Sequence, residues 1–310
     1  MSAIASNGGP RAAPVKAMIF MLAAVAMYAL VDASAKWLTA GYGVIQILFI
    51  GRIVDPAFAI WLAHRHGNGW PDIRTRRLPL HIARTVIALT SIGTYFIALK
   101  LLPLAEAVSI GFASPLFMAI LSIPLLGEKV GPRRWIAIVV GFIGVLVIIR
   151  PGMVPLSWGA IAALGSGILY AFGLITSRRL AATESLPSLM FWFSAIGLVA
   201  TGALLPFDWR MPVAADIVPI AVVMLLTTIA QLCLTQAFRY GEVSLIAPLE
   251  YTALVWGSFY GWLIWDELPD LWVFVGAGIM VASGVYLIHR EHRASRIKLE
   301  PNIGQIPSDT

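Results

Sequence analysis

The sequence predicts an all-α integral membrane protein with ten transmembrane helices in two inverted repeats of five. Composition is the first observation: 59% of the 310 residues are hydrophobic and 12% are charged, whereas soluble domains have about 45–50% apolar and roughly 25% charged residues. The second observation is a series of long apolar runs with short polar links. The third is a set of landmarks from the first half that recur in the second half.

Ten apolar runs are long enough, or nearly so, to cross a bilayer as helices, for which about 20 apolar residues are needed. They occupy residues 17–38, 43–63, 81–101, 104–126, 132–149, 157–177, 188–206, 216–237, 243–265 and 271–288. The links between them are polar or rich in proline and glycine. We therefore expect ten membrane-spanning helices.

The first run contains "MYALVDASAKWL" (27–38), in which "ASA" is typical of a signal-peptide cleavage site. The same stretch aligns with "LYAFGLITSRRL" (169–180), placing Tyr28 on Tyr170 and Lys36 on Arg178. An internal segment cannot be a signal peptide. We therefore expect the first run to be a retained transmembrane helix.

Further landmarks repeat at an offset of about 139 residues, and they include Lys100 on Arg239 and Glu128 on Glu267. Each half then holds five spans, and an odd number inverts the second half relative to the first, as in many secondary transporters. The predicted segments are a cytoplasmic N-terminal segment at 1–16, repeats at 17–150 and 156–288, and a basic, disordered cytoplasmic tail at 289–310.

Positive charge is distributed asymmetrically along the chain. Sixteen of the 22 Lys and Arg residues lie at the termini and at alternate links, four lie at the opposite ends of the spans, and two lie inside spans. Cytoplasmic loops carry the excess of Lys and Arg in membrane proteins. We therefore place both termini in the cytoplasm. The net charge of +6 then reflects topology, and no nucleic-acid partner is expected.

Motifs for metal binding, cofactor binding or catalysis are absent from the sequence. Cys233 is the single cysteine, and the five histidines stand at the ends of apolar runs, where solvated interfacial side chains are expected. No P-loop, Ser/His/Asp set or aspartate-rich motif appears. We expect no metal or cofactor and no enzymatic activity, although a membrane enzyme and a channel remain as alternative functions.

The segments "ASPLFMAILSIPLLGEKVGPRRWIAIVVGFIGVLVIIRPG" (113–152) and "APLEYTALVWGSFYGWLIWDELPD" (247–270) each run from a proline through an apolar stretch to a glutamate. In this, the chain resembles the EamA-type branch of the drug/metabolite transporter superfamily over residues 17–290. Shorter stretches, among them "VDASAKWL", are similar to a sub-branch that includes S-adenosylmethionine carriers.

The resemblance implies a bacterial inner-membrane protein with a central cavity lined mostly by helices 1, 3, 4, 6, 8 and 9. It implies secondary active or facilitative transport of a small metabolite by alternating access, the substrate being an amino acid, a nucleoside or S-adenosylmethionine-like compound, a cofactor or a drug. Substrate, direction, coupling ion and oligomeric state stay open, with a homodimer as one option.

Charged side chains inside spans are candidate functional residues, because each costs about 2.5–3.5 kcal/mol to insert. Asp32 and Lys36 share a helix face with Tyr28. Either Asp32 and Lys36 form a self-neutralised pair at the outer mouth, or Asp32 faces the cavity and meets a cationic substrate or a proton. Arg84 is either an interfacial anchor or the site of an anionic group. Arg52 and Asp55 are expected to form a structural pair.

Glu250 is the strongest single candidate, since it follows Pro248 inside a predicted span with no basic residue within four positions. Its carboxylate needs a distant partner such as Arg84, a watered cavity, or a proton, and desolvation favours the protonated form. Glu106 lies near the outer end of its span and is a weaker candidate. These acids make proton coupling an expected option.

Polar side chains on two repeat-related spans are either cavity-lining groups or interhelical hydrogen-bond partners. The members retained as pathway candidates are Thr94, Tyr95, Gln231 and Thr235. Pro115 and Pro248 each remove a backbone donor and are expected to bend their helices, either for gating or as static kinks. The aromatic residues of the ninth span are expected mainly to pack.

Overall fold

The computed structural model of the protein describes residues 14–126, 132–150, 157–181, 183–207, 209–240 and 247–299. These residues form helices and no strands. The α-helices are α1 (Pro14–Leu38), α2 (Val44–Ile50), α3 (Asp55–His66), α4 (Leu78–Leu101), α5 (Leu104–Gly111), α6 (Ser114–Leu126), α7 (Pro132–Ile149), α8 (Trp158–Ala181), α9 (Leu186–Leu204), α10 (Ile217–Tyr240), α12 (Ala253–Trp265) and α13 (Leu271–Leu299). The 3-10 helices are η1 (Trp70–Asp72), η2 (Leu205–Phe207), η3 (Ala214–Asp216) and η4 (Ala247–Thr252).

The chain is an integral membrane protein by the length and apolar composition of its helices. Six helical stretches are long and apolar enough to span a bilayer. They are Pro14–Leu38, Val44–Arg65, Leu78–Leu101, Trp158–Ser177, Leu186–Phe207 and Ala214–Ala237. Shorter apolar helices lie at Leu104–Met118, Trp135–Ile149 and Leu271–Tyr286. The predicted all-α membrane class is therefore confirmed.

Three predicted spans are interrupted, which is a more broken architecture than the apolar runs predict. The span at 43–63 breaks at residues 51–54, the span at 104–126 breaks at 112–113, and the described part of the span at 243–265 begins with η4. A proline follows or lies in each interruption: Pro56, Pro115 and Pro248. Proline has no N–H to donate to the carbonyl four residues earlier, so a helix ends readily before it.

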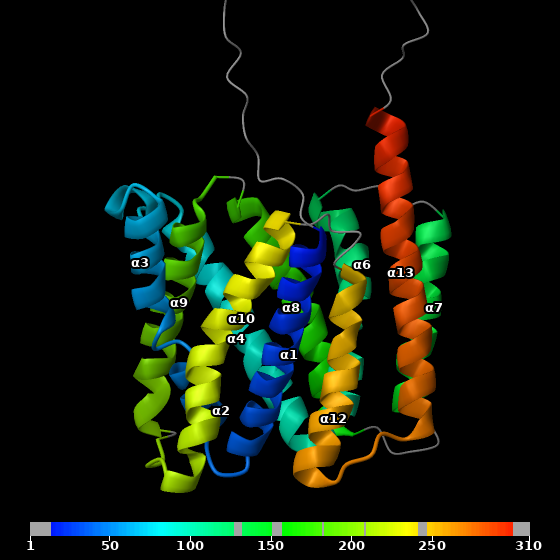
Figure 1. The fold of residues 1–310 in the computed structure, drawn as a ribbon, viewed down its shortest axis with the longest axis horizontal. Helices are drawn as coiled ribbons and strands as arrows, with labels where there is room; N and C mark the ends of the chain where they lie inside the picture. The colour runs from blue at the N-terminus through cyan, green and yellow to red at the C-terminus, as the bar shows by residue number, and fades with distance from the viewer. Residues whose placement is uncertain are drawn as a thin grey trace, which may run out of the picture.

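The last helix is longer than predicted. The final apolar run ends at residue 288, but α13 continues to Leu299 and rises above the neighbouring helices in Figure 1. The expectation of a disordered tail at 289–310 is therefore wrong for residues 289–299. Residues 300–310 lie outside the described part of the chain.

The long helices pack in pairs that connect the two halves of the sequence. α1 packs along α10, α4 along α8, α3 along α9, α5 along α12, and α7 along α13. In Figure 1, α3 and α9 form one edge of the bundle, and α7 and α13 form the other. Exchanging the halves converts the α1–α10 pair into the α8–α4 pair and leaves the α3–α9 and α7–α13 pairings unchanged.

The crossing of α7 and α13 repeats this symmetry at the level of single contacts. A Cβ atom on Gly144 would lie 2.7 Å from the Gly276 carbonyl oxygen, so the two backbones touch. Farther along the crossing, the Ser283 hydroxyl donates to the Ala137 carbonyl at 2.5 Å. The repeat offset of 139 residues places Gly144 on Ser283 and Ala137 on Gly276. Exchanging the halves therefore converts one of these contacts into the other.

Two apolar cores of unequal extent lie at opposite ends of the bundle, which we call the Pro14 end and the Leu38 end after the limits of α1. The large core lies toward the Leu38 end and joins α1, α2, α4, α5, α7, α8, α10 and α13. The small core lies at the Pro14 end and consists of Ala17, Met21, Val25 and Ala237 with their neighbours on α1, α10, η4 and α12.

Candidate functional site

Four of the predicted pathway residues meet between α1, α4 and α10. The Tyr28 hydroxyl donates to Gln231 Oε1 at 2.7 Å, which connects α1 to α10. The Tyr95 hydroxyl donates to Asp32 Oδ2 at 3.2 Å, which connects α4 to α1. Tyr28 and Asp32 are one helical turn apart, so the two hydrogen bonds are neighbours. We call Tyr28, Asp32, Tyr95 and Gln231 the α1 polar site.

Tyr170 of α8 extends this site toward the Pro14 end. It lies within electrostatic range of Tyr28 on one side and of Glu250 on the other. Half of its surface, 50%, is nevertheless exposed. Tyr170 therefore combines charged and polar neighbours with exposed surface, which makes it a further candidate pathway residue. The sequence alignment of Tyr170 with Tyr28 was the signal that could have marked it as a candidate.

Lys36 is not paired with Asp32, so the self-neutralised pair considered for α1 is wrong. The Lys36 ammonium lies 2.6 Å from Glu267 Oε2 and donates to the Leu102 carbonyl at 2.9 Å. Glu267 Oε2 also accepts from the Leu104 backbone N–H at 3.1 Å, and Lys36 lies over the Trp265 ring. We call this arrangement the Lys36 latch. It joins α1, the α4–α5 link and the α12–α13 link at the Leu38 end.

Arg52 and Asp55 form the expected structural pair, at 3.2 Å between Nη1 and Oδ2. Both are buried where α2 gives way to α3. Asp55 also accepts a hydrogen bond from the Thr228 hydroxyl of α10, and the Arg52 guanidinium lies over the Phe193 ring. These contacts stabilise the break in the second span, because they satisfy charges that the membrane interior would otherwise disfavour.

Arg84 is bonded by the protein rather than left free for an anion. Its Nε donates to the Ser177 hydroxyl at 2.7 Å and its Nη1 to the Leu189 carbonyl at 3.1 Å. The guanidinium also lies over the Phe193 ring. In the described residues Arg84 forms no ion pair with Glu250, so that pairing is wrong. These contacts favour a structural role in joining α4, α8 and α9.

Glu250 lies in η4, partly buried, and the described residues offer it neither a hydrogen bond nor an ion pair. Glu106 lies in the first turn of α5, within electrostatic range of Arg150 and Asp270, and so belongs to the Leu38 end. The side chains of Pro115 and Pro248 lie outside the described residues. The backbone of Pro115 follows the break in the fourth span, and that of Pro248 lies in η4.

The polar side chains predicted on the two repeat-related spans, which are α4 and α10, have two roles. Thr94 and Thr235 donate to carbonyls of their own helices, at Thr90 and Gln231. Ser91 donates across helices to the Ser166 carbonyl, in the manner of an interhelical hydrogen bond. On α12 the aromatic side chains contact one another, Trp256 stacking on Tyr260 at 5.8 Å, as expected for packing.

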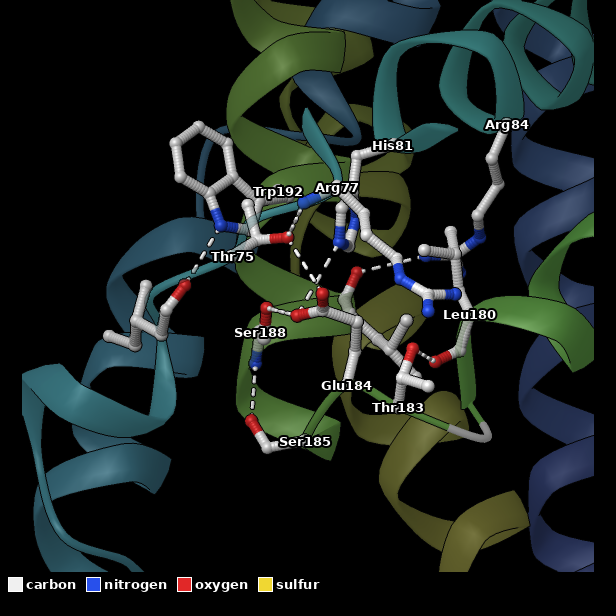
Figure 2. Close-up of polar contacts among 12 residues, drawn as sticks. Thr75, Arg77, His81, Arg84, Leu180, Thr183, Glu184, Ser185, Ser188 and Trp192 are labelled. Atoms are coloured by element: carbon white, nitrogen blue, oxygen red, sulfur yellow. Dashed lines mark hydrogen bonds and ion pairs between the residues drawn. The ribbon is translucent and has the colours of Figure 1, made fainter. Parts of the chain in front are cut away.

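A second polar cluster, drawn in Figure 2, corrects the expectation that the histidines are solvated. His81 is completely buried, with Nε2 at 3.8 Å from Glu184 Oε2. Glu184 accepts from the Thr75 hydroxyl at 2.8 Å and from the Ser188 hydroxyl at 2.9 Å. His64 is exposed as expected. Burial of His81 follows from its place at the start of α4, where α8 and α9 cover it.

Comparisons with known proteins place these features in a family. The sequence profile of the EamA-like transporter family matches residues 15–150 and 157–289. The chain is 25% identical to a riboflavin transporter from Rhizobium johnstonii over 288 residues, with 93% of this chain and 95% of the relative covered.

Two further relatives match over most of their length. Identity is 26% with the pseudopaline exporter CntI of Pseudomonas aeruginosa, covering 84% of this chain and 91% of the relative. It is 24% with an S-adenosylmethionine uptake transporter of Rickettsia felis, covering 87% and 91%. A solved crystal structure has the same fold, with a TM-score of 0.65 over 91% of this chain and 99% of that chain at 19% identity.

Proposed function

The chain belongs to the EamA-like transporter family, and from this premise we propose that it moves a small metabolite across a bacterial inner membrane by alternating access. The observation that carries the proposal is the position of the α1 polar site. It lies between the Leu38 end, which contains the large core and the Lys36 latch, and the Pro14 end, which contains the small core. A carrier needs such a site, which each side of the membrane reaches in turn.

The proposed architecture is ten transmembrane helices in two inverted repeats. The two segments that match the family profile support repeats near 17–150 and 156–288. The symmetrical helix pairs and the exchangeable contacts of α7 and α13 support the inversion. The bias of Lys and Arg assigns the Pro14 end, and with it both termini, to the cytoplasm.

In this orientation the structure is closed toward the outside. The Lys36 latch and the large core seal the outer end. At the Pro14 end α1 packs into the smaller core, and this supports our proposal that the α1 polar site is reached from the cytoplasm. Transport then requires the latch to open and the cytoplasmic end to close, and the breaks near Pro115 and Pro248 supply bending points.

The driving force is a gradient, because the sequence has no ATP-binding loop. Asp32 and Glu250 are the carboxylates near the pathway, and they would carry the proton in proton-coupled transport. Facilitated exchange needs no such proton. The names of the relatives include both an exporter and uptake transporters, so direction is not fixed by family.

Proteoliposomes that contain the purified protein test the proposal. We expect saturable uptake of radiolabelled riboflavin or S-adenosylmethionine, the compounds named for two relatives, and acceleration by unlabelled compound on the opposite side. Counterflow is specific to a carrier, whereas a channel gives flux that does not saturate. Asp32→Asn should abolish the signal and Asp270→Asn, which alters an exposed ion pair, should not. Absence of saturable counterflow with both compounds would remove the proposal.

A further inference from the structure

The link between α3 and α4, residues 67–77, has a defined conformation that its own hydrogen bonds maintain. The Asn68 backbone N–H donates to Asp72 Oδ2 at 2.8 Å, and η1 lies within the link. The link is also attached to α9, because the Trp192 indole N–H donates to the Ile73 carbonyl at 2.8 Å (Figure 2). Its surface side chains are therefore presented from a folded segment.

A tryptophan marks this link and its counterpart in the second half. The repeat offset of 139 residues places Trp70 on Trp209 of the α9–α10 link, residues 205–216. Both side chains are exposed, at 55% and 45%. Each link joins two helical stretches that are long enough to span a bilayer, and tryptophan is enriched where a membrane meets water. Trp70 and Trp209 therefore mark the two opposite membrane surfaces.

The two links differ in their cations. The α9–α10 link has one, Arg210, and its guanidinium donates to the Gly41 carbonyl at 2.9 Å. Four exposed arginines lie at the end of α3 and in the α3–α4 link: Arg65, Arg74, Arg76 and Arg77. Among the described residues, no hydrogen bond or ion pair engages any of these four side chains. One membrane surface therefore carries a group of cations without a counter-ion from the protein.

We propose that residues 65–77 bind an anionic phospholipid, with the arginines contacting the headgroup phosphate and Trp70 lying beside the glycerol and the start of the acyl chains. Guanidinium groups match the geometry of phosphate oxygens. Basic clusters next to membrane spans recognise anionic lipids on the cytoplasmic side. The side of the membrane rests on the orientation given under the proposed function, whereas the binding itself does not depend on transport.

The place of the link selects a lipid over a dissolved phosphate ion. Arg65 ends one candidate span and Leu78 begins the next, so the arginines between them lie at the level of the headgroups. A phosphate at that level belongs to a molecule whose acyl chains enter the bilayer. Trp70 adds an aromatic side chain with an apolar body, which a free ion does not require.

Native mass spectrometry of the purified protein in detergent tests the proposal. Dioleoylphosphatidylglycerol and dioleoylphosphatidylcholine share their acyl chains and differ in headgroup charge, and titration with each gives the Kd of the first bound lipid. We expect the anionic lipid to bind at least about tenfold more tightly, since each arginine at a membrane surface adds a factor of about five. Glycerol 3-phosphate, which lacks acyl chains, should not displace it.

Variants assign the preference to the link. Arg65→Gln, Arg74→Gln and Arg76→Gln together should raise the Kd of the anionic lipid about tenfold or more, toward that of the neutral lipid. Arg77 is retained because its backbone N–H bonds to Thr75 in the cluster of Figure 2. Trp70→Gln, made alone, should weaken both lipids while the preference for the anionic lipid stays.

A matched control removes three positive charges from another place. Arg290→Gln, Arg293→Gln and Arg296→Gln change the last turns of α13, which lies at the opposite edge of the bundle from α3 in Figure 1. This triple variant should keep the full preference for the anionic lipid. A built site predicts that difference between the two triple variants, whereas general surface charge predicts equal losses.

Equal affinity for the two lipids, a preference that survives the triple variant of the link, or an equal loss in the α13 control would overturn the proposal. Displacement of the lipid by glycerol 3-phosphate would overturn it as well, since the site would then bind phosphate alone. The proposed function is judged separately by saturable counterflow. A protein that shows counterflow without the lipid preference remains a carrier, and one with the preference but no counterflow retains this site.

Discussion

The two ends of the helix bundle are built differently, and the contrast indicates how the protein works. At the Leu38 end, the large core joins eight helices, and Asp216 accepts hydrogen bonds from both Trp37 and Tyr42. The Lys36 latch adds an ion pair and hydrogen bonds that connect three segments. At the Pro14 end, the described part of α1 packs only into the small core with α10, η4 and α12.

On the proposed transport cycle, the two unequal ends correspond to one of two conformational states. The difference between the ends should then respond to mutations that weaken the Leu38 end more than to those that weaken the Pro14 end. The predictions below follow this logic.

The largest effect is expected for Lys36→Met, which leaves Glu267 without its cation. We expect a loss of about 2–3 kcal/mol in the free energy of unfolding, less than for a fully buried pair because Glu267 keeps some exposure. Chemical denaturation in detergent measures it. The variant should also open the outer end more often.

A double-mutant cycle isolates the latch. Lys36→Met combined with Glu267→Gln should recover part of the lost stability, because no carboxylate is then left unpaired. Asp270→Asn is the matched control at the exposed Arg150–Asp270 pair, and it should cost less than about 1 kcal/mol. If Asp270→Asn costs as much free energy of unfolding as Lys36→Met, the latch contributes no more stability than an exposed ion pair.

Leu99→Ala and Met21→Ala compare the two cores directly, since both side chains are completely buried. Leu99→Ala should cost about 2 kcal/mol, because the large core collapses only partly around the missing atoms. Met21→Ala should cost less, as its surroundings on α1 and α10 are free to adjust. Melting temperatures of the two variants give the order, and the reverse order would show that the Pro14 end is the better packed.

Glu250→Gln should reduce transport about tenfold or more, equivalent to about 1.4 kcal/mol, while expression and melting temperature stay near those of the unmodified protein. The acid has no partner in the described residues, so its removal costs the fold little. Counterflow across a range of pH values measures the effect. Normal transport at every pH would exclude a role for Glu250 in the pathway.

Thr75→Val should have the smallest effect, about 1 kcal/mol in unfolding free energy. It removes the hydrogen bond that the Thr75 hydroxyl donates to Glu184 and the one that it accepts from the Arg77 backbone N–H, in the cluster of Figure 2 and away from the α1 polar site. Transport should be unchanged. Thr183→Val, which removes a longer hydrogen bond to the Leu180 carbonyl, is the matched control and should change stability less.

The sequence predicts the helical spans well, because length and apolar composition determine membrane insertion. It predicts the breaks less well. Pro56 is visible in the sequence, but whether a proline kinks a helix or starts a new one depends on whether other groups satisfy the freed backbone. Here the side chains of Arg52, Asp55 and Thr228 bond to one another at the break, and this packing cannot be derived from local pattern.

Pairing within the site is predicted in part. Tyr28, Asp32, Tyr95 and Gln231 are identified individually as polar groups inside spans, but their partners are fixed by the packing of α1 against α4 and α10. Lys36 shows the limit of local reasoning. Spacing favours Asp32 four residues away, yet the partner is Glu267, 231 residues away. The alignment of Glu267 with Glu128 indicated a repeated acid without indicating its role.

Access to Tyr170 tests the central claim most directly. Tyr170→Cys, in a background where Cys233→Ala removes the native thiol, is reacted with a membrane-impermeant maleimide in inside-out and right-side-out vesicles. A structure sealed at the Leu38 end predicts rapid labelling from the cytoplasmic face and slow labelling from the outer face, with Lys36→Met accelerating the outer reaction. Equal rates from both faces, or faster labelling from outside, would contradict the account.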